Sequence, residues 1–197
     1  LSVCQQAVGI NAVLYYAPRI FQDMGMGNPM VQTVIMGVVN ISFTLVAVFT
    51  VEKLGRKPLL ILGSIGMAVG ALGVALTFGN AALSTVTMIS IMVYSASFMF
   101  SWGPIAWVLI AELFPNTIRG AAVAIAVAFQ WIFNFIVSST FVPMFNMHLT
   151  PGDDFGHWFT YGLYGVICIL AAIFVWKLVP ETKGKTLEDM SKLWRKE

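Results

Sequence analysis

The sequence predicts an all-α membrane protein, and its composition and the spacing of its charges are the two observations that indicate this fold class. Hydrophobic residues make up 58% of the 197 residues and charged residues only 10%, whereas a soluble domain carries roughly 25% charged residues. The mean hydropathy of +0.84 excludes a soluble enzyme and a disordered segment. The formal net charge of +2 is too small for a nucleic-acid-binding surface. The expected surroundings are therefore the lipid bilayer, with no nucleic-acid partner.

Charge-free stretches count the membrane spans, because a charge at bilayer depth is costly and about 20 apolar residues cross the hydrocarbon. The stretch 58–111 is long enough for two spans, and Gly79-Asn80 supplies turn residues between them. The other stretches hold one span each and cover residues 1–18, 24–51, 120–152 and 155–176. We therefore predict a six-helix transmembrane bundle over residues 1–179, with spans at approximately 1–18, 31–51, 58–79, 86–111, 120–143 and 158–178.

The beginning and the tail of the sequence differ from these spans. Leu1 opens within an apolar segment, without the basic region of a signal peptide, so we expect the sequence to be part of a longer one. After Pro180 the chain becomes polar, and Thr186 is placed to cap a short helix. The apolar residues of that helix recur at helical spacing and are Leu187, Met190, Leu193 and Trp194. The sequence thus predicts a cytoplasmic amphipathic tail over residues 180–197.

The distribution of Lys and Arg predicts the orientation, because basic residues gather in cytoplasmic loops. With six spans, both termini lie on one side of the membrane. Arg19 is the one basic residue on the other side. The remaining basic residues are Lys53, Arg56, Lys57, Arg119, Lys177, Lys183, Lys185, Lys192, Arg195 and Lys196. We therefore expect a multi-pass protein of the cell (inner) membrane with both ends of this segment cytoplasmic.

Apart from Lys177 at the very end of the last one, the predicted spans contain neutral polar side chains and no Asp, Glu, Lys or Arg. Gln130 and Asn134 are four residues apart in the fifth span, so they share one helix face. The other amides are Gln5, Gln6 and Asn11 in the first span and Asn40 in the second. Each amide taken singly fits interhelical hydrogen bonding as well as it fits a ligand site.

Helix-breaking residues favour a binding site over simple packing. If the six spans form two triplets, the first and fourth occupy corresponding positions. The first carries Gly9 and Pro18, and the fourth carries Gly103-Pro104. Interruptions at corresponding positions indicate the midplane site of a transporter. On a straight helix Gln6 and Asn11 would point about 140° apart, so they reach one site only if the span bends or unwinds near Gly9.

The types of residue in the spans indicate the class of substrate. An amide both donates and accepts hydrogen bonds, which suits the vicinal hydroxyls of a polyol. Aromatic rings such as Trp107 and Trp131 offer faces for the C–H side of a sugar, although each ring taken alone also fits ordinary packing. An anionic substrate would require Arg or Lys, and an amine would require a carboxylate. A neutral polyol such as a sugar is therefore the simplest inference.

Two acid-plus-arginine sets recur at the predicted cytoplasmic helix ends. Arg56 follows Gly55 at a helix start, where the helix dipole disfavours a cation, so we expect a carboxylate partner. Glu112 and Arg119 form the second set. Ion pairs at this end could form in one conformation and break in another. We interpret Arg56, Glu112 and Arg119 as a gate, although the positive-inside rule alone would also place basic residues here.

Three other signals were considered and assigned no functional role, so we expect no cofactor and no metal. Gly184-Lys185-Thr186 ends like a phosphate-binding loop, but Val179 stands where the motif requires glycine. An outer loop contains His148, Asp153, Asp154 and His157 without a recognised ligand spacing, so we interpret it as a solvated loop. The third span has glycines at close-packing spacing, interpreted as packing residues: Gly63, Gly66, Gly70 and Gly73.

These motifs together resemble the sugar porter family of the major facilitator superfamily, specifically its C-terminal six-helix half. Segments 101–104, 124–131 and 180–188 most resemble the bacterial symporters of the family. The matching motifs follow the family's order along the chain and are Gln5-Gln6-x-x-Gly9-x-Asn11-x-x-x-Tyr15-Tyr16, Gly55-Arg56-Lys57, Gly103-Pro104-x-x-Trp107, Glu112-x-Phe114-Pro115-x-x-x-Arg119-Gly120 and Pro180-Glu181-Thr182-Lys183-Gly184.

The resemblance implies roles for individual residues. Arg56, Glu112 and Arg119 match the family's cytoplasmic salt-bridge network. Tyr15 matches an aromatic residue that helps to close the outer side. The residues that match sugar contacts or line the cavity beside them are Gln5, Gln6, Asn11, Asn40, Gly103, Trp107, Gln130 and Trp131.

The resemblance further implies a secondary transporter and not an enzyme. The expected partners are a monosaccharide, such as D-xylose or a related pentose or hexose, and the N-terminal six-helix half of the same transporter. We expect the transport to be coupled to protons through that half, because the spans of this one hold no carboxylate. A facilitative sugar uniporter, a membrane sugar sensor and an inactive remnant are the alternatives left open.

Overall fold

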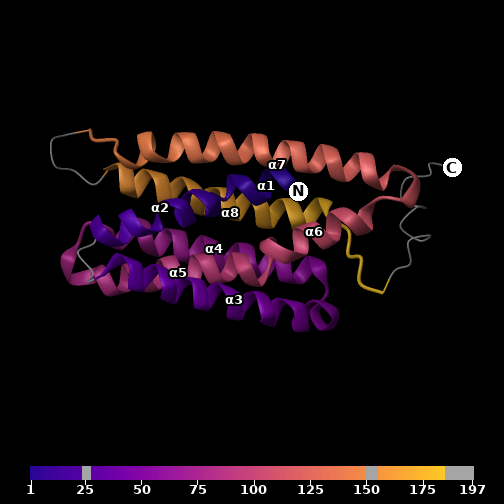
Figure 1. The fold of residues 1–197 in the computed structure, drawn as a ribbon, viewed down its shortest axis with the longest axis horizontal. Helices are drawn as coiled ribbons and strands as arrows, with labels where there is room; N and C mark the ends of the chain where they lie inside the picture. Colours follow the sequence, from indigo (N-terminus) through magenta and orange to yellow (C-terminus); the bar gives the residue numbers. More distant parts are fainter. Residues whose placement is uncertain (24–27, 150–154, 185–197) are drawn as a thin grey trace.

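A computed structural model describes residues 1–23, 28–149 and 155–184, and the regular elements in these ranges are helices. They are α1 (Ser2–Ala7), α2 (Ile10–Asp23), α3 (Pro29–Leu54), α4 (Arg56–Thr77), the short 3-10 helix η1 (Ala81–Leu83), α5 (Ser84–Phe100), α6 (Trp102–Leu113), α7 (Asn116–Phe145) and α8 (Phe155–Leu178). Figure 1 shows an elongated bundle whose long helices run side by side. At the right of this view α3 passes into α4, α6 into α7, and α8 ends. We call this the basic end.

Five helical stretches of the described chain are long and apolar enough to cross a membrane. Four of the predicted spans each overlap one of them, and the predicted span 86–111 overlaps the stretch Ser84–Leu113, which is α5 followed by α6. The predicted span 1–18 corresponds to α1 and α2, two shorter helices in succession. The helix predicted around Thr186 lies outside the described residues.

The core forms where α4 packs between α5 and α8. The glycines of α4 face α5, because a Cβ atom added to Gly63 would lie 1.6 Å from the Ser101 Oγ atom and one added to Gly70 would lie 2.7 Å from the Tyr94 backbone nitrogen. Their absent side chains let the two helices approach closely, which confirms the packing interpretation. In contrast, α3 and α7 expose large apolar side chains such as Phe49 and Phe135, each 73% accessible.

The first predicted span is interrupted at Gly9, as the sequence predicts. Gly9 has a φ angle of +85°, a left-handed conformation that glycine adopts without steric cost. Its backbone N–H donates to the Gln6 carbonyl at 2.9 Å, three residues back instead of four. Pro18 lies inside α2 and the helix continues through it. Of the two helix breakers in this segment, Gly9 therefore makes the interruption.

The fourth predicted span is interrupted at Ser101, two residues before the expected Gly103-Pro104. Ser101 has φ and ψ angles of −132° and −84°, outside the helical region. Pro104 lacks an N–H and so leaves the Phe100 carbonyl without its helical donor. The first residue after the break, Trp102, is anchored to α4, because its indole nitrogen donates to the Leu60 carbonyl at 3.2 Å. The proline therefore acts one turn upstream of its own position.

Candidate functional site

Amide side chains from three helices lie together inside the bundle in two hydrogen-bonded sets. The side-chain amide nitrogen of Asn11 in α2 donates to the side-chain oxygen of Gln6 in α1 at 2.6 Å. The same oxygen accepts from the Asn134 amide nitrogen of α7 at 3.2 Å. Gln130 of α7 donates to the Gln5 side-chain oxygen at 2.9 Å. The meeting of Gln6 and Asn11 confirms the prediction that the span bends near Gly9. We call these five amides the amide network.

The amide network also reaches the second interrupted segment. Gln5 donates its amide to the Trp102 carbonyl at 2.8 Å, and the Gly103 carbonyl lies 3.4 Å from the same nitrogen. Both carbonyls belong to the first turn of α6, directly after the break at Ser101. The two interruptions and α7 therefore converge on neutral polar groups that lie together, as expected for a site built on discontinuous helices.

The amide network is buried and retains unused hydrogen-bonding capacity. Gln5 and Gln6 are 2% and 4% accessible. The Gln130 side-chain oxygen is buried and accepts no hydrogen bond from the described residues. An unpaired buried acceptor destabilises the site by about 1–3 kcal/mol. The Gln130 side-chain oxygen can therefore accept a hydrogen bond from a hydroxyl group, and the other amides can exchange amide–amide hydrogen bonds for amide–hydroxyl ones.

Among the described contacts, four of the nine predicted sugar-site residues neither belong to this network nor form a hydrogen bond with it. Tyr15, Trp107 and Trp131 are 58%, 42% and 66% accessible, so their rings present surface that this chain does not cover. Asn40 of α3 instead accepts a hydrogen bond from the Ser95 hydroxyl of α5 at 2.7 Å. Asn134 belongs to the amide network but is absent from the predicted site. Its spacing of four residues from Gln130 was the signal that could have included it.

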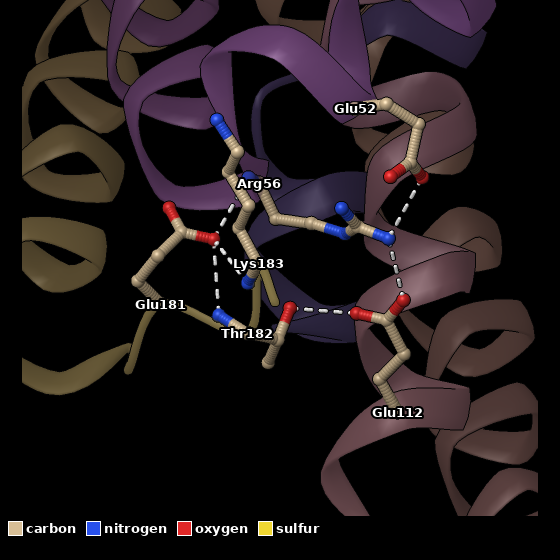
Figure 2. A network of polar contacts seen from close by, with 6 residues as sticks. All are labelled: Glu52, Arg56, Glu112, Glu181, Thr182 and Lys183. Carbon is tan, nitrogen blue, oxygen red and sulfur yellow. Dashed lines mark hydrogen bonds and ion pairs between the residues drawn. The ribbon is translucent and has the colours of Figure 1, made fainter. Parts of the chain in front are cut away.

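A charged network lies at the basic end and ties three elements together (Figure 2). The Arg56 guanidinium at the start of α4 lies 2.8 Å from the Glu112 carboxylate of α6 and 3.1 Å from that of Glu52 in α3. The second Glu112 oxygen accepts from the Thr182 hydroxyl at 2.6 Å. The carboxylate partner expected for Arg56 is therefore present, and Glu112 joins α4, α6 and the segment after α8.

Glu181 caps the N-terminus of α4 from a distant part of the sequence. Its two carboxylate oxygens accept from the backbone N–H groups of Arg56 and Lys57, each at 3.0 Å. The N–H groups of Thr182 and Lys183 donate to it as well, as Figure 2 shows for the Thr182 bond. Partial burial raises the pKa of Glu181. The hydrogen bonds from these four N–H groups lower it by more, so the pKa lies below the ordinary glutamate value.

Sequence reasoning placed Glu181 in a matching motif but assigned it no role, although a signal for the cap exists. The residue before α4 is Gly55, which has no side chain to cap the helix. A helix that starts with Arg56-Lys57 after a glycine requires an acceptor from elsewhere for its first N–H groups. A Cβ atom on Gly55 would lie 2.8 Å from a Glu181 carboxylate oxygen. The glycine therefore makes room for the distant carboxylate.

Glu112 and Arg119, grouped as the second acid-plus-arginine set, are not paired with each other in this conformation. Among the described residues, the side-chain ion pairs at this end are those of Arg56 with Glu52 and with Glu112. Arg119 instead donates from its Nε and Nη2 atoms to the Phe114 carbonyl at 3.3 and 3.2 Å. Arg119 therefore closes the end of α6 against the start of α7, because a cation near a helix C-terminus satisfies its last carbonyls.

An apolar groove of about 580 Å³ also opens at the basic end. Residues of α1, α6, α7 and α8 line it, among them Val3, Ile110, Ile125 and Phe174, and the amide network contributes none of its lining. A sugar requires hydrogen-bond partners that such a lining does not provide. The groove is therefore a separate feature from the amide network.

In the described residues, no group of three His, Cys, Asp or Glu side chains gathers near the histidines of the predicted outer loop. The His157 ring lies between those of Phe78 and Phe145, with centroid distances of 4.3 and 4.2 Å. Asp153 and Asp154 lie outside the described residues. His157 therefore belongs to an aromatic cluster between α4, α7 and α8.

Comparisons with known proteins show the family to which this chain belongs. The family model described as "Sugar (and other) transporter" matches residues 1–194. The D-xylose-proton symporter of Escherichia coli (strain K12) is 50% identical over the whole of this chain, which covers 40% of that protein. The glucose facilitated diffusion protein of Zymomonas mobilis is 42% identical over 97% of this chain, which covers 41% of that protein.

A solved structure of the proton:xylose symporter of the major facilitator superfamily, bound to 6-bromo-6-deoxy-D-glucose, matches with a TM-score of 0.87 and 49% identity. The match covers 98% of this chain and 41% of that one. The chain thus spans about 40% of the length of the relatives it matches. The predicted fold class, an all-α membrane protein with the architecture of half a major facilitator superfamily transporter, is confirmed. This chain belongs to the sugar transporter family of the major facilitator superfamily.

Proposed function

We propose that the protein carrying this chain moves a neutral monosaccharide across the membrane by alternating access, and that the amide network binds the sugar. The observation that carries this proposal is the convergence of both interrupted segments and α7 on buried neutral amides. Relatives named for D-xylose and for glucose transport support a sugar as the substrate class. D-xylose or a related pentose or hexose is the expected sugar.

The sugar replaces bonds that the amides now make with one another. Gln130 accepts from a hydroxyl through its unpaired oxygen, and the amide nitrogens of Gln5 and Asn11 turn from their present acceptors to sugar oxygens. Because amides are neutral donors and acceptors, this exchange moves no charge into the bilayer. The exposed rings of Trp107 and Trp131 cover the sugar together with the N-terminal half, and Tyr15 closes the outer side.

The charged network acts as the gate at the basic end, which we place in the cytoplasm according to the positive-inside rule. In the present conformation Glu112 holds Arg56 and Thr182 together. Opening of this end separates α6 from α4 and breaks these bonds, so their free energy biases the equilibrium between two conformations. Arg119 serves the gate through the α6–α7 connection.

Proton coupling belongs to the N-terminal half in this proposal. The amide network contains no ionisable group, and proton relays in membranes use carboxylates or histidines. Facilitated diffusion is the second candidate, which the relative from Zymomonas mobilis favours by its name. Uptake of sugar with and without a proton gradient in vesicles separates the two mechanisms, and a sensor would show binding without uptake.

The binding site is tested by Gln6→Ala and Gln130→Ala in the complete protein. Each variant loses about one hydrogen bond to the sugar and leaves a partner unpaired, so the sugar dissociation constant should rise about five- to tenfold. Gln22→Ala is a matched control, because Gln22 is an exposed amide of α2 outside the amide network. Equilibrium binding of labelled sugar gives the comparison. Unchanged affinity in both variants would remove the sugar site from the amide network.

A further inference from the structure

The break at Gly9 leaves the Val8 carbonyl without a helical donor. The positive φ of Gly9 turns the chain between α1 and α2, and the next helical bond, from Val13, goes to the Gly9 carbonyl at 3.2 Å. Val8 is fully buried. A backbone carbonyl inside a membrane protein has no bulk water to bind, so another group of the protein must satisfy it.

Two tyrosines from other helices meet this break. The Tyr94 hydroxyl of α5 donates a hydrogen bond to the Val8 carbonyl. The Tyr164 ring of α8 lies against Gly9, because a Cβ atom added there would stand 2.6 Å from two ring carbons. Tyr94 is fully buried and Tyr164 is 3% accessible. The hydrogen bond and the ring contact act on consecutive residues of the chain.

The two tyrosines contribute different groups. The hydroxyl of Tyr164 has no hydrogen-bond partner among the described residues, and neither has that of the neighbouring Tyr161. The contribution of Tyr164 therefore comes from its ring, whereas that of Tyr94 comes from its hydroxyl. None of the three touches the amide network through a hydrogen bond in the described chain.

We infer that Tyr94 and Tyr164 are positioning residues that clamp the break between α1 and α2, and thereby hold Gln6 and Asn11 in the geometry that binds the substrate. Gln6 lies before the break and Asn11 after it, and their 2.6 Å contact requires the chain direction that the break sets. The link from this clamp to sugar affinity rests on the proposed function, whereas the clamp itself rests on the contacts at Val8 and Gly9.

The experiment compares Tyr94→Phe with Tyr161→Phe and Tyr164→Phe in the complete protein, in lipid nanodiscs. Each of the three variants removes one buried hydroxyl. Of these hydroxyls, that of Tyr94 binds a backbone carbonyl at the break, and the other two do not. Hydrogen–deuterium exchange of residues 1–14 should become about fivefold faster in Tyr94→Phe, as expected for the loss of one hydrogen bond. Exchange in the other two variants should match the parent protein.

Labelled-sugar binding to the same variants tests the link to the site. The dissociation constant should rise about three- to fivefold in Tyr94→Phe and stay constant in Tyr161→Phe and Tyr164→Phe. The maximal uptake rate should change less than the affinity, because the clamp positions the binding amides. Tyr164→Leu, which keeps an apolar side chain but removes the ring, should weaken binding where Tyr164→Phe does not.

Equal exchange of residues 1–14 in Tyr94→Phe and Tyr161→Phe overturns the clamp. Faster exchange with unchanged sugar affinity overturns the positioning role, provided that Gln130→Ala weakens binding. If Gln130→Ala leaves binding intact, the assigned sugar site fails instead, and the exchange comparison alone then supports or overturns the clamp. Failure of the clamp and failure of the proposed function therefore give different results.

Discussion

The amide network and the charged network perform the same structural task with different chemistry. Each joins helices that are far apart in the sequence: the amide network joins α1 to α7, and the charged network joins α4 to α6. The amide network is neutral and lies within the bundle, where the transfer of a charge from water would cost several kcal/mol. The charged network lies at the basic end, where the Glu52 side chain is 73% accessible. Position relative to the bilayer therefore decides which polar groups the fold uses.

The two networks also depend on the backbone in different ways. The amide network needs a helix that is interrupted, because Gln6 and Asn11 meet only across the break at Gly9. The charged network needs helices that end, because Glu181 binds the free N–H groups at the start of α4. Substitutions that act on the break should therefore affect the amide network, and those that act on helix ends should affect the charged network.

The largest effect is expected from Gly9→Ala. Alanine at a φ angle of +85° is strained by about 1 kcal/mol, and its Cβ atom would overlap the Tyr164 ring at 2.6 Å, which adds about 1–3 kcal/mol. We expect a total destabilisation of about 3 kcal/mol and a loss of sugar binding, because Gln6 and Asn11 separate. Thermal unfolding in detergent and sugar binding measure the two effects.

Gly162→Ala in α8 is the control for this variant. Among the described residues, nothing beyond its own helix and chain neighbours lies within 4 Å of a Cβ atom at Gly162, and alanine is the better helix former. Its unfolding temperature should stay equal or rise. A Gly9→Ala protein that is as stable as Gly162→Ala would contradict the strained break.

The next largest effect on stability is expected from substitutions in the charged network. Arg56→Met leaves the Glu112 carboxylate without its cation, and loss of a charge-assisted hydrogen bond costs about 2 kcal/mol. Arg119→Met removes bonds to the Phe114 carbonyl alone and should cost less, about 1 kcal/mol. The unfolding temperature should fall more in Arg56→Met.

High salt refines this comparison. The difference between the parent protein and Arg56→Met should shrink in about 1 M salt, because screening weakens partly exposed ion pairs. Variants of the amide network should be insensitive to salt. A larger loss in Arg119→Met than in Arg56→Met would show that Arg119 has the ionic role at this end.

Glu181→Gln tests the helix cap and its pH dependence. The variant keeps the shape but loses the charge that faces the α4 N-terminus, which should cost about 1 kcal/mol at pH 7. Because the pKa of Glu181 is lowered in the folded protein, its contribution is present above the ordinary glutamate pKa of about 4.3. It is lost as the pH falls through the lower folded value.

Unfolding temperatures of the parent protein and Glu181→Gln, measured from pH 7 to pH 3, therefore should converge at the acid end. The Gly162→Ala difference gives an internal reference, because that substitution changes no titratable group and meets no described neighbour. A difference between parent and Glu181→Gln that grows as the pH falls would contradict the direction of the pKa shift.

The sequence predicts the amide network better than the charged one, for a physical reason. Amides inside apolar spans stand out, and the 140° angle between Gln6 and Asn11 on a straight helix already indicated the break that their contact confirms. The pairing at the basic end depends on how helix ends meet in space. Sequence order therefore suggested Glu112 with Arg119, whereas the fold places Glu112 beside Arg56.

Long-range backbone contacts were also beyond sequence reasoning. Glu181 lies 125 residues from Arg56, whose N–H it accepts, and no local pattern links the two. The interruption before α6 was expected at Gly103-Pro104 but lies at Ser101. A proline removes the donor to the fourth residue before it, so the pattern was informative but its position was shifted by one turn.

The smallest effect sharpens the comparison between the networks. Gln5 and Gln130 share one neutral hydrogen bond, and such bonds between membrane helices average about 0.6 kcal/mol. A double-mutant cycle of Gln5→Met and Gln130→Met should give a coupling near that value, well below the effect of Arg56→Met. Sugar affinity should fall in both single variants although stability changes little. A coupling above about 2 kcal/mol would mean that the amides serve mainly as structural connections, because bonds that strong would not yield to sugar hydroxyls.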